Sequence, residues 1–421
     1  MCIKELLNRD IDCLCGKTHR CDIDVLEIGE GALESLPKAL ENYNGVLLVS
    51  DGNTYLLCAE RVKAMLGEKL VSECFFDTVK PLVPDESAIE KIESCLTPKT
   101  DIVLGIGSGV IQDLCKYVSH FKCVPYAVVA TAPSMDGYAS SGAAMILEGM
   151  KETVSAGLPL AIFADTEVLK DAPMEMIKAG YGDIIGKFSA LNDWRLSTLI
   201  NGEFFCEYIY GVTYAMTEKT LKLGAGLLKR DEESVKALTE ALIVVGIMMS
   251  FLGNSRPASG SEHHLSHYFE ITGIVKNRPY FPHGIDVAYS TVITAQIREN
   301  LLNKSFDTPL YRENRQEYEE KILDLYGDSV GKGCIALQDK MGRYQENRAP
   351  LHKEKEAEIK EILASMPSGE VIDKMLSLVE LDYNELHTLY GKETLENAVK
   401  YAKDLKDRYT VLWLNYDLGG N

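Results

Sequence analysis

The chain has 421 residues, which corresponds to two or three domains at roughly 100–200 residues per domain. Hydrophobic residues make up 46% and charged residues 25%, a usage that excludes a disordered chain, a collagen and a small disulfide scaffold. The formal net charge of −19 argues against binding to nucleic acid and against docking on an anionic membrane, because both depend on cationic side chains.

Cysteines and a histidine cluster near the start of the chain. Cys13, Cys15, His19 and Cys21 lie within nine residues, and such side chains hold structural zinc in proteins. The Cys-x-Cys spacing differs from the usual zinc pair, so a thiol-containing turn that leads into the first strand stays the alternative. The odd total of 11 cysteines and the lack of an apolar signal-peptide core favour reduced thiols in the cytoplasm.

Short apolar runs alternate with helical patterns over the first 165 residues. Near-continuous apolar runs are typical of parallel strands that are covered on both faces. Helical patterns at 88–96 and 111–121 lie between them, which predicts an α/β lobe with a parallel sheet. The predicted strands are 46–52, 102–107, 124–130 and 160–164.

After about residue 166 the pattern becomes helical, and no strand run is evident before the last few residues. We therefore predict an α/β domain over 1–168 and an all-α domain over 169–421. The apolar stretch 241–255 has 15 uncharged residues, short of the roughly 20 that span a bilayer, so we expect a buried helix and no membrane insertion. The predicted helices are 173–200, 204–221, 233–251, 315–325, 353–365 and 394–408.

Two loops of the first domain follow predicted strands. Gly105, Gly107 and Gly109 end one strand and begin a helix, whose first N–H groups and positive dipole end suit a phosphate. Their spacing departs from GxGxxG, so a tight turn without a ligand stays open. The loop 131–142 carries several hydroxyl groups and one carboxylate at the edge where parallel sheets bind ligands, although an ordinary turn is the alternative.

Four of the eight histidines lie within 21 positions. His263 and His267 are four residues apart on one face of a predicted helix, whereas His264 points about 100° away. With His283 they suggest a divalent transition metal, and Asp183, a Gly-flanked acid in an apolar helical run, would complete the ligands. The alternatives are a helix-surface feature for the histidine pair and a cap or an ion pair for Asp183.

Taken together, these segments resemble the sn-glycerol-1-phosphate dehydrogenases, in the superfamily of metal-dependent polyol dehydrogenases and dehydroquinate synthases. Each segment is weak by itself, but they occur in the family's order over about 180 residues. The matching segments are 105–113, 131–140, 180–187 and 255–263, with His267 and His283-Gly284.

The resemblance implies a role for each residue. Asp183, His263 and His283 are implied to be the metal ligands, His267 a proton relay or substrate contact, and Asp136 a contact to a substrate hydroxyl. Asp51 is implied to bind the adenosine ribose, where its carboxylate favours NAD over NADP. The other implied cofactor contacts are Gly107, Ser108, Gly109, Val110, Ile111, Gln112, Thr131, Ser134 and Ser140.

The implied activity is interconversion of sn-glycerol 1-phosphate and dihydroxyacetone phosphate with NAD or NADP and one divalent metal, zinc, nickel or iron. Arg256 and Lys187 are candidate cations for the substrate phosphate. The resemblance also implies a cytoplasmic homodimer in phospholipid metabolism, without a nucleic-acid partner. Three other functions stay open: a glycerol dehydrogenase, a lyase like dehydroquinate synthase, and a metal- and nucleotide-binding module without turnover.

Overall fold

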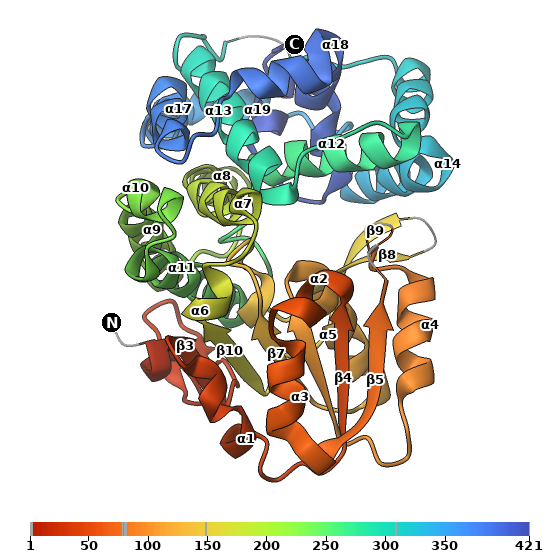
Figure 1. Cartoon of the computed structure of the whole chain (residues 1–421). Helices are drawn as coiled ribbons and strands as arrows, with labels where there is room; N and C mark the ends of the chain where they lie inside the picture. Colours follow the sequence, from red (N-terminus) through yellow and green to blue (C-terminus); the bar gives the residue numbers. More distant parts are fainter. Residues whose placement is uncertain (1–2, 78, 80–81, 148–149, 308–309, 421) are drawn as a thin grey trace. The chain divides into compact units, whose positions relative to one another are not determined.

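The computed structural model describes residues 3–77, 79, 82–147, 150–307 and 310–420. These residues form two compact units (Figure 1). The first unit contains residues 1–181 and 222–255, and the second contains 182–221 and 256–421. We predicted a single boundary near residue 168, whereas the chain passes from one unit to the other three times, after residues 181, 221 and 255. The segment 222–255 belongs to the first unit because its helix packs on a loop of that unit, as described below.

A six-stranded parallel sheet forms the centre of the first unit. All four predicted strands are confirmed, and two edge strands were missed. Edge strands are covered less completely, so the apolar run that marks a central strand is interrupted in them by polar residues. In spatial order the strands are β3 (Val25–Gly29), β10 (Ala161–Asp165), β7 (Tyr126–Ala130), β6 (Ile102–Gly107), β4 (Val46–Asp51) and β5 (Leu70–Phe76).

The chain reverses its direction of winding between β4 and β6. From β4 the chain continues to β5 on one side, and from β6 it continues through β7 to β10 on the other. In an open α/β sheet this reversal leaves a crevice at the carboxyl ends of the two strands, where ligands bind. Asp51 ends β4 and Gly107 ends β6, so both lie at this edge.

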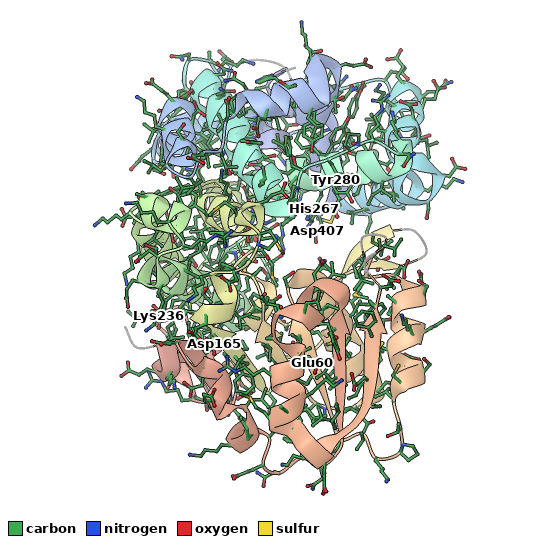
Figure 2. The ribbon with its side chains drawn as sticks, viewed as in Figure 1. Glu60, Asp165, Lys236, His267, Tyr280 and Asp407 are labelled. Atoms are coloured by element: carbon green, nitrogen blue, oxygen red, sulfur yellow. The ribbon has the colours of Figure 1, made fainter. Side chains whose placement is uncertain are left out.

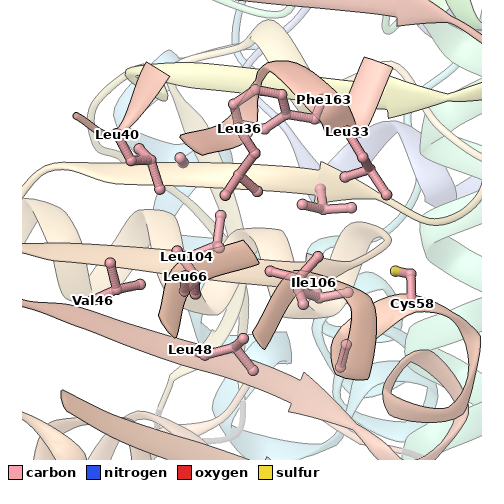
Figure 3. Close-up of a cluster of buried hydrophobic side chains, with 14 of the residues drawn as sticks. Leu33, Leu36, Leu40, Val46, Leu48, Cys58, Leu66, Leu104, Ile106 and Phe163 are labelled. Carbon is pink, nitrogen blue, oxygen red and sulfur yellow. The ribbon is translucent and has the colours of Figure 1, made fainter. Parts of the chain in front are cut away.

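Helices cover both faces of the sheet, and successive side chains of a strand alternate between them. Val46 and Leu48 face α1 (Leu36–Ala39) and α3 (Glu60–Leu66) in one apolar cluster (Figure 3). Leu47 and Val49 face α4 (Glu86–Cys95) and α5 (Gly109–Lys122) in the other. This two-sided burial explains why the central strands are apolar throughout.

Two hairpins were not predicted. One pairs β1 (Ile11–Asp12) with β2 (Thr18–His19), and the other pairs β8 (Gly142–Leu147) with β9 (Met150–Ser155). The strands of the first hairpin have two residues each, too few to show a period in the sequence.

Helix α11 (Glu232–Leu252) belongs to the first unit. A Cβ on Gly246 would lie 3.1 Å from the Cβ of Ala139, so the helix packs closely on the loop that follows β7. Among the described residues, α11 alone is long and apolar enough to cross a membrane, but 72% of its most apolar 18-residue window is buried within the protein. The buried helix expected over 241–255 is therefore confirmed as far as Leu252, where α11 ends, and Gly253 and Asn254 beyond it are exposed.

The second unit is helical, as predicted, over the residues that the structure describes. The strand suspected at the end of the chain is wrong, because Val411–Asp417 forms a helix whose residues are all buried. A helix buried on every side has no polar face, so its sequence resembles that of a buried strand. The helices are α8 (Lys187–Asn201), α9 (Glu207–Thr220), α12 (Ser261–Lys276), α13 (His283–Leu302), α14 (Arg315–Met341), α15 (Ala349–Glu354), α16 (Glu356–Ala364), α17 (Gly369–Ser377), α18 (Asn384–Tyr401) and α19 (Val411–Asp417).

Strand β6 packs so closely on α5 that a side chain at Gly107 should destabilise the fold. A Cβ on Gly107 would lie 2.4 Å from the Cβ of Ile111, so Gly107→Ala forces strand and helix apart. We expect this change to lower the free energy of unfolding by about 1–3 kcal/mol. Gly157→Ala is the control, because nothing lies within 4 Å of its added Cβ, and its effect should stay below about 1 kcal/mol. Urea denaturation followed by circular dichroism measures both, and equal stabilities would contradict the packing argument.

Candidate active site

Residues of the second unit bring together the acid and two of the histidines singled out in the sequence. Asp183 lies on α7 (Met174–Ile185), His263 lies on α12, and His283 is the first residue of α13. One donor atom from each lies within 4.8 Å of the others, and Asp183 and His263 are buried. A carboxylate oxygen and two imidazole nitrogens form a donor set that divalent transition metals accept.

Glycines allow α7 to approach α13 closely enough for this convergence. A Cβ on Gly182 would lie 2.5 Å from the carbonyl oxygen of Gly284, and one on Gly186 would lie 2.5 Å from the Val287 side chain. Both positions therefore require the absence of a side chain. The segment 180–187 carries its glycines for close packing beside Asp183.

Both histidines are oriented through Nδ1. The Nδ1 atom of His263 lies 2.7 Å from Oε1 of Glu262, and that oxygen also accepts the N–H of Gly260 at 2.7 Å. The Nδ1 atom of His283 lies 3.2 Å from the hydroxyl of Ser266. A partner at Nδ1 directs Nε2 toward a metal, as is usual for histidine ligands. Sequence reasoning missed Glu262 and Ser266, because nothing in residue spacing marks a partner of this kind.

The distances within the group fit a metal ion. Two donors about 2.1 Å from one tetrahedral ion lie about 3.4 Å apart. Nε2 of His263 lies 3.6 Å from Oδ1 of Asp183. The buried Lys187 donates to the same oxygen at 2.7 Å.

The other two histidines of α12 lie in different surroundings. His267, labelled in Figure 2, is partly exposed, and its ring centroid lies 6.2 Å from that of His263 and 5.5 Å from that of His283. It is therefore a neighbour of the ligand group. His264 is fully buried, and burial together with nearby cations lowers its pKa well below the usual range, which favours a neutral ring.

The start of α12 is held by a buried carboxylate. Oδ2 of Asp193 accepts the N–H of Ser261 at 2.7 Å, and its Oδ1 accepts from Arg298 at 2.7 Å and from the N–H of Val411 at 2.8 Å. These bonds fix the first turn of the helix that carries His263 and His267. Asp193 is a positioning residue that sequence analysis did not identify.

The predicted cofactor residues lie in the first unit, at the carboxyl ends of β4, β6 and β7. Asp51 caps α2 (Gly52–Thr54), and its Oδ1 accepts the N–H groups of Asn53 and Thr54 at 2.9 Å each. Ser108 connects β6 to α5, whose first turn comprises Gly109, Val110, Ile111 and Gln112. The first N–H groups of an α-helix have no partner inside the helix, so this turn presents donors at the sheet edge. Thr131 lies beside it, and its N–H donates to the Gly107 carbonyl at 3.3 Å.

Two of the predicted cofactor residues hold the loop 131–142 instead of facing outward. The amide of Gln112 donates to the carbonyls of Gly137 and Tyr138 at 2.9 and 3.0 Å. The hydroxyl of the buried Ser140 donates to the Gly137 carbonyl at 3.0 Å. The buried Lys116, which sequence analysis missed, donates to the Gly142 carbonyl at 2.7 Å. Ser134 and Asp136 are partly exposed residues of the same loop.

The two cations suggested for a substrate phosphate are buried and bound internally. Arg256 donates to Glu203 at 2.9 Å and to the Tyr409 carbonyl at 2.8 Å. Lys187 bonds to Asp183, as described above, and to the Ala258 carbonyl at 3.2 Å. These internal bonds give both residues a structural role.

Known proteins match this chain in sequence and in fold. The family model described as iron-containing alcohol dehydrogenase matches residues 27–173. The chain is 34% identical over 358 residues to the glycerol-1-phosphate dehydrogenase (NAD(P)+) of Halalkalibacterium halodurans, covering 78% of this chain and 90% of that protein. It is 28% identical over 424 residues to the glycerol-1-phosphate dehydrogenase (NAD(P)+) of Geobacillus stearothermophilus, covering 99% and 98%.

Solved structures confirm the predicted fold. An iron-containing alcohol dehydrogenase from Thermococcus thioreducens matches with a TM-score of 0.58 at 16% identity, covering 94% of this chain and 99% of that one. At this identity the likeness concerns the fold alone. The sequence identity and coverage of the relatives are sufficient for membership, and the chain belongs to the glycerol-1-phosphate dehydrogenase family.

Proposed function

We propose that the chain is a metal-dependent oxidoreductase that interconverts sn-glycerol 1-phosphate and dihydroxyacetone phosphate with NAD or NADP. The observation that carries this proposal is the convergence of Asp183, His263 and His283, with an orienting partner at Nδ1 of each histidine. The relatives named glycerol-1-phosphate dehydrogenase support the choice of substrate and cofactor.

Each residue has a distinct part in this proposal. Asp183, His263 and His283 would hold the divalent metal, which when bound would supply the Lewis acidity that lowers the pKa of the substrate hydroxyl. His267, partly exposed beside them, accepts the proton that the substrate hydroxyl loses. Asp136 binds a second hydroxyl of the substrate and so fixes the orientation of the carbon that exchanges hydride with the nicotinamide.

The N-terminal turn of α5 takes the anionic end of the cofactor. Its N–H groups and the positive end of the helix dipole bind the pyrophosphate, and Gly105 and Gly107 let the strand and the helix come close enough to form the turn. Thr131 and Ser134 contribute hydroxyl groups from the next strand end. Asp51 reaches the ribose from the neighbouring strand end, which is the usual place for an acid that binds a ribose hydroxyl.

We also propose a cytoplasmic homodimer. The described cysteines are free thiols, which suits a reducing compartment. Assembly as a dimer rests on the family resemblance, and light scattering measures it directly.

Substrate choice is tested by NADH oxidation in the presence of Zn²⁺ or Ni²⁺. We expect NADH fluorescence to decay with dihydroxyacetone phosphate and to stay constant without a carbonyl compound. Decay with only unphosphorylated dihydroxyacetone would instead favour a glycerol dehydrogenase. No oxidation with either compound would contradict the proposal and favour a lyase or a non-catalytic module.

The ligand group is tested by metal content. Asp183→Ala and His263→Ala should each lose the metal ion of this group together with turnover, because the two donors that remain hold it too weakly. Glu262→Gln should weaken metal affinity about 10–100-fold through the orientation of His263. The control is His387→Ala, which changes an exposed histidine. Elemental analysis after dialysis measures the content, and full metal retention in Asp183→Ala would show that Asp183 is not a ligand.

Cofactor preference is tested at Asp51. Asparagine caps a helix as well as aspartate does, so Asp51→Asn keeps the cap on α2 and removes only the charge. We expect the preference for NAD over NADP to fall roughly tenfold, because repulsion of the 2′-phosphate is lost. The ratio of kcat/KM values for the two cofactors measures this effect. An unchanged ratio with unchanged stability would place Asp51 away from the ribose.

A further inference from the structure

We propose that the β1–β2 hairpin binds a structural zinc ion through Cys13, Cys15 and His19. This site uses no residue of the candidate active site and stands independently of the proposed reaction. One donor atom from each of these residues lies within 4.8 Å of the others. Cys13 and Cys15 are partly exposed and His19 is buried, so an ion could enter from the thiol side.

The hairpin turn sets the positions of the two thiols. The N–H of Cys13 donates to the Lys17 carbonyl at 3.1 Å, and the N–H of Gly16 donates to the Cys13 carbonyl at 3.0 Å. Gly16 has a φ of +83°, which side chains rarely adopt, and nothing lies within 4 Å of an added Cβ there. The glycine therefore serves the turn conformation alone. The ladder that pairs Ile11 with His19 then brings the imidazole beside the sulfurs.

The imidazole of His19 is oriented as a ligand. Its Nδ1 lies 3.1 Å from the carbonyl oxygen of Phe251, and its ring stacks on the Phe251 ring with centroids 5.4 Å apart and planes 11° apart. A carbonyl only accepts, so Nδ1 carries the proton, and in the neutral ring Nε2 carries the lone pair. This is the usual arrangement of a histidine that binds a metal through Nε2.

The sulfur-to-nitrogen distance fits zinc. A sulfur 2.3 Å and a nitrogen about 2.1 Å from one tetrahedral ion lie about 3.6 Å apart. Sγ of Cys15 lies 3.4 Å from Nε2 of His19. Two thiolates and an imidazole favour zinc over magnesium or calcium, which take oxygen ligands. Binding releases two protons, one from each thiol, and leaves the sulfur oxidation state unchanged.

Cys21, the fourth residue of the sequence cluster, has a different role. Its side chain is fully buried, and burial raises the pKa of its thiol to about 12. It is not a member of the group of donors found around His19. The remaining position of a zinc tetrahedron is therefore filled by a donor outside the hairpin, either a further thiolate or water.

The site is tested by zinc content in an Asp183→Ala background, which removes the proposed active-site metal. We expect protein made in zinc-supplemented medium to keep about one zinc ion per chain after dialysis. Adding Cys13→Ser and Cys15→Ser should remove it, whereas adding Cys123→Ser, at an exposed cysteine, should not. Equal zinc in the triple variant with both hairpin substitutions and in the double variant with Cys123→Ser would overturn the proposal. In the wild-type background the hairpin variants should also lose one zinc, whatever the outcome at Asp183.

A measurement on the unaltered chain covers the case in which the hairpin variants do not fold. Iodoacetamide should modify Cys13 and Cys15 at least about tenfold more slowly with zinc than after treatment with a chelator, because the metal holds the thiolates. Cys123 should react equally in both. Mapping all 11 cysteines by mass spectrometry also identifies any further thiolate ligand. Equal modification of Cys13 and Cys15 in the two states would overturn the proposal, since a plain thiol–imidazole hydrogen bond does not respond to a chelator.

Discussion

The candidate metal centre depends on the close approach of α7 and α13. At Gly182 the space between the two helices is too small for any side chain. A Cβ there would lie 2.5 Å from the Gly284 carbonyl oxygen and 2.7 Å from the Ala288 Cβ. The neighbouring residues of these two glycines are Asp183 and His283. Packing density, which makes even one added methyl group costly, therefore fixes the distance between two of the proposed ligands.

Buried charges hold the remaining ligand helix. The carboxylate of Asp193 accepts hydrogen bonds from Arg298 and from two backbone N–H groups. Both of its oxygens are therefore bonded, and its negative charge balances the positive charge of Arg298. Such a network adds little net stability, but removing one partner leaves an unpaired buried charge at a cost of about 3–5 kcal/mol. Because hydrogen bonds are directional, the bonds of Asp193 to Ser261 and Val411 tie the first turn of α12, which carries His263, to α8 and α19.

Sequence analysis was most accurate for features that depend on the residues of one helix or strand alone. Central strands such as 102–107 are apolar throughout because both faces are buried, whereas the edge strands Val25–Gly29 and Leu70–Phe76 are interrupted by polar residues. Asp183, His263 and His283 were predictable from residue type and family resemblance. Ser266 and Asp193 were not, because their hydrogen bonds join different helices. Glu262 was not, because residue order does not show that its carboxylate turns back onto the neighbouring His263. Gln112 and Ser140 have side chains that suit a cofactor, and only their bonds to the loop reveal their structural use.

The two proposed metal sites differ in how they would select an ion. Two imidazoles and one carboxylate accept zinc, nickel or iron with affinities that follow the general order of these metals, so supply decides which one binds. Two thiolates and an imidazole at the hairpin favour zinc more strongly, because soft thiolate ligands select it. A net charge of −19 attracts all divalent cations alike and adds no selectivity. With two sites, the metal that is lost on Asp183→Ala substitution reports on the reactive site, whereas the total metal content is the sum over both sites.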